Sequence, residues 1–303
     1  HQSGRRQRQM CIRDRIEGLR RLESRGYDSS GIVVKNGSLQ VHKKVGNVSE
    51  LSKILPNHVE GCSGIAHTRW ATHGGVTDAN AHPHTSNDGK IALVHNGIIN
   101  NAKGLRRRLE DRGFELKSET DSEALVHMIS IGIDSGQTPL ESVRETLKRV
   151  TGTWGLCVIF KEYDVIVCAR NGSPLILGKG EGESFVSSEP HTLTQYTRDH
   201  YILEDGDLAV ITKDGIDISR LEGGISATSM TVFEDDWGEP DMAGYPHYML
   251  KEIHEQPDAI RRCISGRLDP TNGSATLGGL KLEPIRLRTA SHVRLIGLSL
   301  IHI

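Results

Sequence analysis

Residues 154–180 read WGLCVIFKEYDVIVCARNGSPLILGKG, and this stretch indicates the class of fold. Its three short apolar runs, 154–160, 165–169 and 175–178, are separated by turn-forming pairs such as Asn171-Gly172. Two further β-rich runs follow at 184–187 and 201–212. Short runs divided by such turns predict antiparallel strands. Because helical patterns flank the runs without regular strand–helix alternation, we predict an α+β fold with two largely antiparallel sheets.

The segments before this stretch carry further strand and helix signals. An amphipathic helix is predicted at 16–25, where Gly26 ends it, and another at 101–112. Asn36-Gly37 lies between two β-rich runs and predicts a type I′ hairpin, in which both residues have positive φ. Shorter strands are expected at 64–67 and 91–95.

Two helices are predicted in the later part of the chain. Thr138 and Glu141 have the spacing of a capping box, and Pro139 occupies the first helical position. Residues 248–264 are predicted to form a helix after an acidic, turn-rich segment at 235–244. The Gly/Asp/Asn/Thr-rich residues 265–279 are typical of a linker.

Composition narrows the possible partners of this 303-residue chain. Its 37 basic and 39 acidic residues give a formal charge of -2, so no global field attracts nucleic acid or an anionic membrane surface. No apolar run approaches the roughly 20 residues that a membrane helix needs. Five dispersed cysteines without a C-x-x-C pair favour neither a disulfide framework nor a thiolate zinc site. We therefore expect a cytoplasmic protein that binds neither nucleic acid nor membrane.

Both ends of the sequence differ in character from the rest. Residues 1–15 are rich in arginine and glutamine and lack the apolar stretch of a signal peptide, so they are expected to be a non-native or disordered tail. Residues 293–303 form an abrupt apolar run without a following cap or turn. We interpret this run as the start of a further domain cut at its first strand.

Four short segments place unusual residue types at strand ends or in loops, where binding sites are commonly built: 25–31 (RGYDSSG), 67–74 (HTRWATHG), 95–100 (HNGIIN) and 118–121 (SETD). An arginine can bind a carboxylate through two hydrogen bonds and an aspartate can bind an ammonium group, so Arg69 and Asp121 are candidates for holding an amino acid. Asn96, followed by Gly97, offers an amide NH₂ and an unobstructed backbone N–H that could stabilise an oxyanion.

In this order, the four segments resemble the glutaminase domain of the glutamine–fructose-6-phosphate aminotransferases. Further similar strings are 173–178 (SPLILG), 203–207 (LEDGD) and 245–257 (YPHYMLKEIHEQP). The resemblance implies a four-layer α-β-β-α sandwich of the N-terminal-nucleophile hydrolase type, with no cofactor and no metal. It also implies hydrolysis of glutamine through a cysteine thioester, with the ammonia passed to a second domain that converts fructose 6-phosphate to glucosamine 6-phosphate.

The resemblance also assigns roles to single residues. Arg69 would hold the α-carboxylate of glutamine, Asp121 its α-amine, and Asn96 with Gly97 the oxyanion. A loop that closes over glutamine would contain the residues Trp70, Thr72 and His73, with Trp70 as the gate for ammonia. Arg25 would support the surroundings of the nucleophile.

The nucleophile of this family is a cysteine at the mature N-terminus, followed by Gly-Ile-Val-Gly in the first core strand. There, the free terminal amine serves as the base for its own side chain. Here Met10-Cys11 is followed by IRDR, so Cys11 is matched only doubtfully as the nucleophile. Cys62, Cys157 and Cys168 are expected to be small core residues. We therefore expect the chain as written to lack glutaminase activity.

The composition of the two ends and the family resemblance together predict the domain boundaries. We expect the tail at 1–15, the glutaminase domain at 16–235, and a linker with the truncated start of a sugar isomerase domain at 236–303. Fructose 6-phosphate would bind only through the missing domain, and the full-length protein is expected to be a homodimer. Alternatives are another class II amidotransferase, a non-catalytic glutamine-binding fragment, or a zinc site built from a group of histidines: His67, His73, His82, His84 and His95.

Overall fold

The computed structural model describes residues 15–56, 61–71, 74–233, 243–264, 268–269 and 274–275. The chain divides into two compact units between Asp241 and Met242. In the first half of the first unit, as far as helix α5, the elements are η1 (Glu23–Arg25), β1 (Ser29–Asn36), β2 (Ser38–Val45), α2 (Val48–Ile54), β3 (Ser63–Arg69), β4 (His84–Thr85), β5 (Ile91–Ile99), α3 (Ala102–Glu110), α4 (Ser122–Asp134) and α5 (Pro139–Leu147). Residues 15–21 are also helical.

The second half of this unit is built mainly from strands: β6 (Gly152–Phe160), β7 (Ile166–Asn171), β8 (Ile176–Lys179), β9 (Ser184–Ser187), η2 (Pro190–Thr192), β10 (Asp199–Ile202), β11 (Asp207–Thr212), β12 (Gly215–Arg220) and β13 (Thr231–Val232). The second unit contains α6 (Tyr248–Ile264) and the two short strands β14 (Leu268–Asp269) and β15 (Ser274–Ala275).

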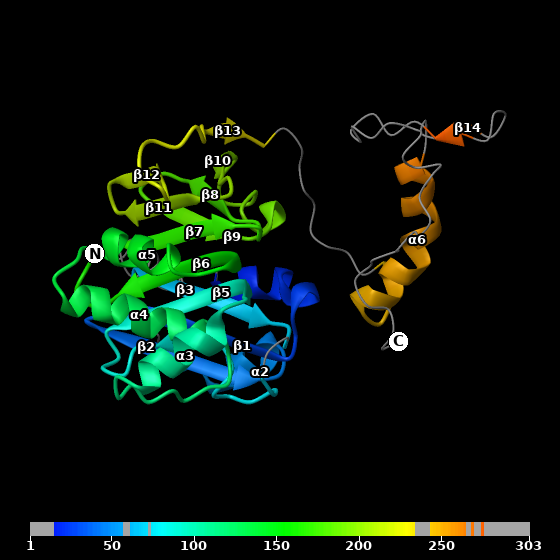
Figure 1. The fold of residues 1–303 in the computed structure, drawn as a ribbon. Helices are drawn as coiled ribbons and strands as arrows, with labels where there is room; N and C mark the ends of the chain where they lie inside the picture. The colour runs from blue at the N-terminus through cyan, green and yellow to red at the C-terminus, as the bar shows by residue number, and fades with distance from the viewer. Residues whose placement is uncertain are drawn as a thin grey trace, which may run out of the picture. The chain divides into compact units, whose positions relative to one another are not determined.

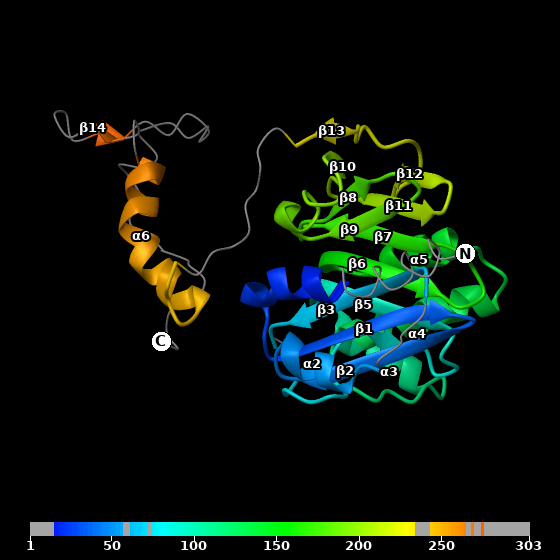
Figure 2. The ribbon, with the colours of Figure 1, turned by 180° about the vertical axis from the view of Figure 1, so that it is seen from behind.

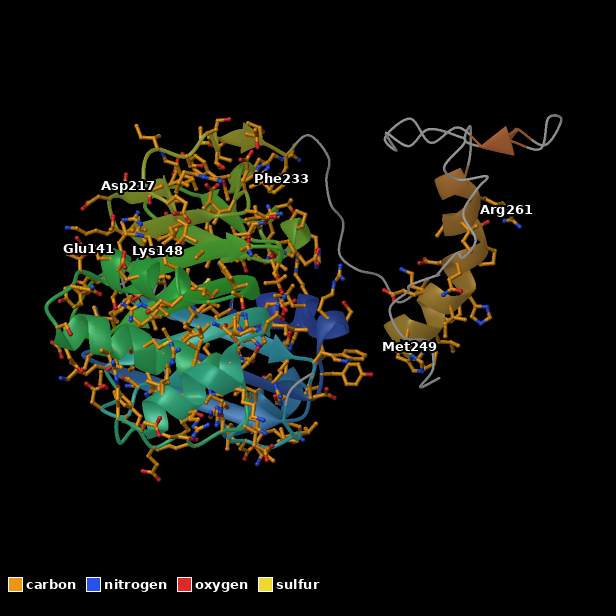
Figure 3. The ribbon with its side chains drawn as sticks, viewed as in Figure 1. Glu141, Lys148, Asp217, Phe233, Met249 and Arg261 are labelled. Carbon is orange, nitrogen blue, oxygen red and sulfur yellow. The ribbon has the colours of Figure 1, made fainter. Side chains whose placement is uncertain are left out.

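A six-stranded antiparallel sheet, in the order β12-β11-β7-β6-β5-β4, forms the centre of the first unit (Figure 1). Side chains alternate between its two faces, as in any strand. On β5, for example, Ile91 and Leu93 pack with the helices, whereas Ala92 and Val94 pack with a second layer of strands. The helices α3, α4 and α5 cover the first face, and the labelled residues Glu141 and Lys148 mark the two ends of α5 in Figure 3.

The second layer of strands consists of two sheets, in the orders β2-β1-β3 and β13-β10-β8-β9. Val33 of β1, Ile65 of β3 and Leu177 of β8 pack in one core with the six-stranded sheet. The opposite face of β1 is covered by α2 and by the helical residues 15–21 (Figure 2). The layers thus follow the order α-β-β-α, and the predicted α+β sandwich is confirmed.

Several sequence predictions hold at the level of single elements. The capping box at the start of α5 is present, with Thr138 accepting from the Glu141 backbone N–H and the Glu141 side chain accepting from the Thr138 backbone N–H. The helix predicted at 248–264 is α6, although Pro257 lies within it. The residues of the predicted linker, apart from β14 and β15, lie outside the described residues.

Three predictions about local structure are wrong. The hairpin at Asn36-Gly37 forms, but only Gly37 has positive φ (66°) and Asn36 pairs with Ser38, so the turn is not type I′. The single strand predicted at 201–212 is interrupted by a turn with φ of 85° at Gly206, and its halves join different sheets. Cys62, predicted to be a core residue, is exposed at the start of β3.

Candidate functional site

Arg69 occupies the last position of β3 and is almost fully buried, with 4% of its surface exposed. Its Nη1 donates to the carbonyl oxygen of Gly75 at 3.2 Å. Burial lowers the pKa of the guanidinium, whereas the nearby carboxylates of Asp28 and Asp121 raise it. The structure therefore places this predicted carboxylate-binding cation within electrostatic reach of Asp121, although 52 residues separate them in the sequence.

Asp121 is the N-cap residue of α4, and it is 8% exposed. Its side chain accepts no backbone N–H from the first turn of its own helix. Instead, Oδ2 accepts the backbone N–H of Ile99 at 2.8 Å, which fixes the carboxylate to the end of β5. Because Asn96 and Gly97 lie on the same strand, this hydrogen bond brings Asp121 to the candidate oxyanion residues.

The backbone at Gly97 has a conformation that other residues rarely adopt, with φ of 144°. A Cβ placed there would lie 2.2 Å from the carbonyl oxygen of Thr153 on the neighbouring strand β6. Asn96 is exposed, and the alternation of β5 directs it to the same face as Ala92 and Val94. Glycine is thus required beside an accessible amide side chain, and the oxyanion role of these two residues stays a prediction.

Trp70 directly follows β3, and 48% of its surface is exposed. Its ring meets the edge of the Tyr27 ring, with a centroid distance of 5.4 Å and an interplanar angle of 69°. The other two residues predicted for this loop, Thr72 and His73, lie outside the described residues.

The residues from Trp70 to Asn80 are called the Trp70 loop below. Asp28, to which the sequence assigned no role, forms hydrogen bonds at the start of this loop. The Asp28 Oδ2 accepts the backbone N–H of Ala71 at 2.8 Å, and the Asp28 backbone N–H donates to the carbonyl of Arg69 at 3.1 Å. The available signal was its position within the 25–31 segment, next to serines that begin a strand. Asp28 therefore links the 25–31 segment to the end of β3 at Arg69 and to the residue after Trp70.

The far side of the same loop is held by Asn80 and Glu119, which sequence reasoning also missed. Glu119 Oε2 accepts from the Gly75 N–H at 3.1 Å and from Asn80 Nδ2 at 3.2 Å. In return, Asn80 Oδ1 accepts the Glu119 backbone N–H at 2.8 Å. These reciprocal hydrogen bonds tie residues 75–80 to the segment that leads into Asp121.

Arg25 has an exposed side chain that forms an ion pair with Glu189 at 2.8 Å. The backbone immediately after it is packed closely, because a Cβ at Gly26 would lie 2.6 Å from the carbonyl carbon of Arg69. Arg25 thus joins the start of the chain's first motif to η2, while its neighbour Gly26 contacts the end of β3. That Arg25 supports the surroundings of the nucleophile stays a prediction.

Apart from the exposed Cys62, the cysteines divide into two groups by position. Cys157 and Cys168 are buried on paired strands with their Sγ atoms 3.4 Å apart, and the hydrogen bond with Cys157 together with burial raises the pKa of Cys168. Protonated thiols in this environment are poor nucleophiles. Cys11 and the side chain of Cys263 lie outside the described residues.

Three histidine rings contact one another near Arg69: the half-buried His67 on β3, and the buried His82 and His84. The ring centroids of His67 and His82 are 4.4 Å apart, and those of His82 and His84 are 4.7 Å apart. Burial lowers the pKa of His67 and of His84 to about 3, and that of His82 well below its ordinary value. The rings are therefore neutral, and the described part of the chain contains no group of three or more side chains placed to hold a metal ion.

Comparison with known proteins adds to this geometry. Residues 67–195, which contain Arg69, Trp70, Asn96, Gly97 and Asp121, match the family described as "Glutamine amidotransferase domain". The chain therefore contains a glutamine amidotransferase domain. The sequence is also 44% identical over 294 residues to glutamine–fructose-6-phosphate aminotransferase of Thermus thermophilus, covering 93% of this chain and 48% of that protein.

Other glutamine amidotransferases agree with this assignment. The aminotransferase of the same name from Chlorobaculum tepidum is 42% identical over 287 residues, covering 92% of this chain and 46% of the relative. The resemblance seen in the sequence is therefore confirmed, and the chain spans about half the length of the curated relatives it matches. The solved structure of glutamine phosphoribosylpyrophosphate amidotransferase from B. subtilis is similar in fold, with a TM-score of 0.58 and 28% identity over 70% of this chain and 47% of that one.

Proposed function

We propose that this chain is the glutamine-hydrolysing part of a glutamine–fructose-6-phosphate aminotransferase. In this proposal, glutamine is hydrolysed to glutamate and ammonia, and a further domain uses the ammonia to convert fructose 6-phosphate to glucosamine 6-phosphate. The observation that carries the proposal is the approach of buried Arg69 to Asp121 beside Asn96 and Gly97. A guanidinium and a carboxylate so placed match the two charges of an amino acid.

The proposed roles follow the chemistry of each group. Arg69 binds the α-carboxylate, Asp121 binds the α-ammonium group, and Asn96 with Gly97 stabilises the oxyanion that forms when the side-chain amide is attacked. Trp70, together with Thr72 and His73, closes over the bound glutamine. No helix among the described residues is long and apolar enough to cross a membrane. We place the protein in the cytoplasm, as a homodimer in its full-length form.

The proposed nucleophile is a cysteine on an N-terminal strand. The edge of β3 away from β1 and the edge of β9 away from β8 pair with no strand in the described ranges. Arg21, the last of the helical residues 15–21, contacts His191 of η2, and Arg25 contacts Glu189 at the start of η2, which follows β9. These contacts support a position for the nucleophile strand between β3 and β9, in the second layer of strands.

Glutamine binding to the chain itself, measured by isothermal titration calorimetry, tests the proposal without requiring hydrolysis. Losing one charge-assisted hydrogen bond in Arg69→Ala should weaken binding by about 10- to 100-fold, since such a bond contributes roughly 1.5–3 kcal/mol. Arg108→Ala, which removes an equal charge from the exposed face of α3, is the matched control and should bind like the wild type. Equal affinities of the Arg69 variant and the control would contradict the proposed role.

Hydrolysis is tested separately, by release of glutamate. The chain as written is expected to release none, whereas a variant in which Cys-Gly-Ile-Val forms the N-terminus ahead of Ile16 is expected to be active. The same variant with Ser-Gly-Ile-Val is the control and should be inactive. Glutamate release by the unaltered chain would show that the nucleophile lies elsewhere in it.

A further inference from the structure

A chain of hydrogen bonds connects the strand of Asn96 to the carboxylate of Asp121. His95 is buried on β5, and its Nδ1 lies 2.8 Å from the Ser122 hydroxyl. Its Nε2 lies 3.2 Å from the carbonyl oxygen of Thr153. The same Ser122 hydroxyl is 3.2 Å from Oδ1 of Asp121. Ser122 thus stands between a histidine that titrates and the carboxylate proposed to bind the α-ammonium group.

The positions of the protons in this series of hydrogen bonds follow from the Thr153 carbonyl at one end, which can only accept. The Thr153 carbonyl has no proton to donate, so Nε2 of His95 must carry one. In a neutral ring Nδ1 is then an acceptor, and the Ser122 hydroxyl donates its single proton to it. That proton is consequently not available to Asp121. Because Ile99 donates to Oδ2, Oδ1 is the oxygen left to accept from a ligand.

We propose that His95 is a positioning residue that keeps the Ser122 hydroxyl proton away from Asp121, so that Oδ1 accepts the α-ammonium group of glutamine. This inference rests on the proposed function. When His95 gains a proton, Nδ1–H donates to the Ser122 oxygen and the serine proton turns to Oδ1. The serine then competes with the ammonium group, and glutamine binding weakens.

The surroundings of His95 favour its neutral form. Burial lowers the pKa of His95, while Asp121 and the hydrogen bond to Thr153 offset part of this effect. His67 on β3 and His82 both lie within electrostatic reach of His95. Both rings are themselves neutral for the reasons given above. The competition is therefore expected only on the acid side of the ordinary histidine pKa.

The proton assignment is tested by ¹⁵N NMR of histidine-labelled protein. The expected spectrum has His95 neutral at about pH 7.5, with its proton on Nε2 and an acceptor shift at Nδ1. Ser122→Ala should move the Nδ1 shift, whereas Ser130→Ala, a buried serine further along α4, should leave it unchanged. A neutral His95 with its proton on Nδ1 would overturn the inference, whether or not glutamine binds.

The consequence for glutamine is tested by calorimetry against pH, with folding checked by circular dichroism at each pH. One pH unit below the His95 midpoint seen by NMR, about ten-elevenths of the rings are protonated, so wild-type affinity should fall about ten-fold. Ser122→Ala should lack this loss, and Ser130→Ala should show it. Parallel losses in wild type and Ser122→Ala would refute the inference, whereas no binding at neutral pH would refute the proposed function.

Discussion

Gly97→Ala should destabilise the protein strongly, because the structure has no space for a side chain there. The added Cβ would lie 2.2 Å from the carbonyl oxygen of Thr153 and 2.7 Å from its carbonyl carbon. Unbonded heavy atoms normally approach to about 3.5 Å. The obstacle is the backbone of β6, a central strand of the six-stranded sheet, so it cannot be relieved by turning a side chain.

The expected cost has two parts. Forcing an extra methyl group into packed structure costs about 1–3 kcal/mol, and holding a non-glycine residue at φ of 144° costs about 1–3 kcal/mol more. Together they predict a loss of about 2–6 kcal/mol. For a domain of this size each kcal/mol lowers the melting temperature by about 2–4 °C, so a fall of roughly 5–20 °C is expected.

Thermal unfolding followed by circular dichroism measures this loss, and Gly104→Ala is the matched control. Gly104 lies within α3, where an added Cβ meets no atom within 4 Å. Alanine there should be neutral or stabilising by up to about 1 kcal/mol. If Gly97→Ala melts within about 3 °C of the wild type while Gly104→Ala behaves as expected, the packing argument for Gly97 is wrong.

Three further predictions concern acid stability and the Trp70 loop. Because the folded protein keeps His67 and His84 neutral with pKa values of about 3, urea unfolding should become easier as pH falls below 6.5, and unchanged midpoints down to about pH 5 would contradict this. Burial raises the pKa of Glu123, but the nearby His127 ring and hydrogen bonds from Lys117 and Ser118 lower it to about 2. Glu123→Gln should therefore flatten the stability loss of about 3 kcal/mol expected between pH 4.5 and about pH 2, as acid titration would show. Asp28→Ala should speed hydrogen exchange of the Ala71 amide, and unaltered protection would exclude that hydrogen bond.

The sequence was sufficient to predict those elements whose structure is determined by residues adjacent in the chain. The capping residues of α5 and the glycine that closes the first helical segment act within one turn, so their patterns predict their structures. The same holds for the short apolar runs of β6 to β9, whose turns lie beside them. The helix α4 was not predicted, because nearly all its residues from Ser122 to Ser130 are buried and no polar face marks the helical period.

Predictions failed where distant contacts decide the outcome. The run at 201–212 is apolar enough for one strand, yet β10 joins β8 while β11 joins β7 in the other layer. Cys62 directly precedes the strand β3, yet its side chain is exposed. Similarly, the residue types of Arg69 and Asp121 indicated amino-acid recognition, whereas their approach to each other depends on the Ile99–Asp121 hydrogen bond between α4 and β5.

The two faces of β5 explain why a single strand serves both binding and support. Odd positions face the helices, so His95 reaches Ser122 at the start of α4, and even positions face the second layer of strands, where Asn96 lies. A shift of one residue in the pairing of β5 with β6 would exchange these faces and would also move Gly97 away from Thr153. The required glycine thus fixes the register that puts His95 and Asn96 on opposite faces.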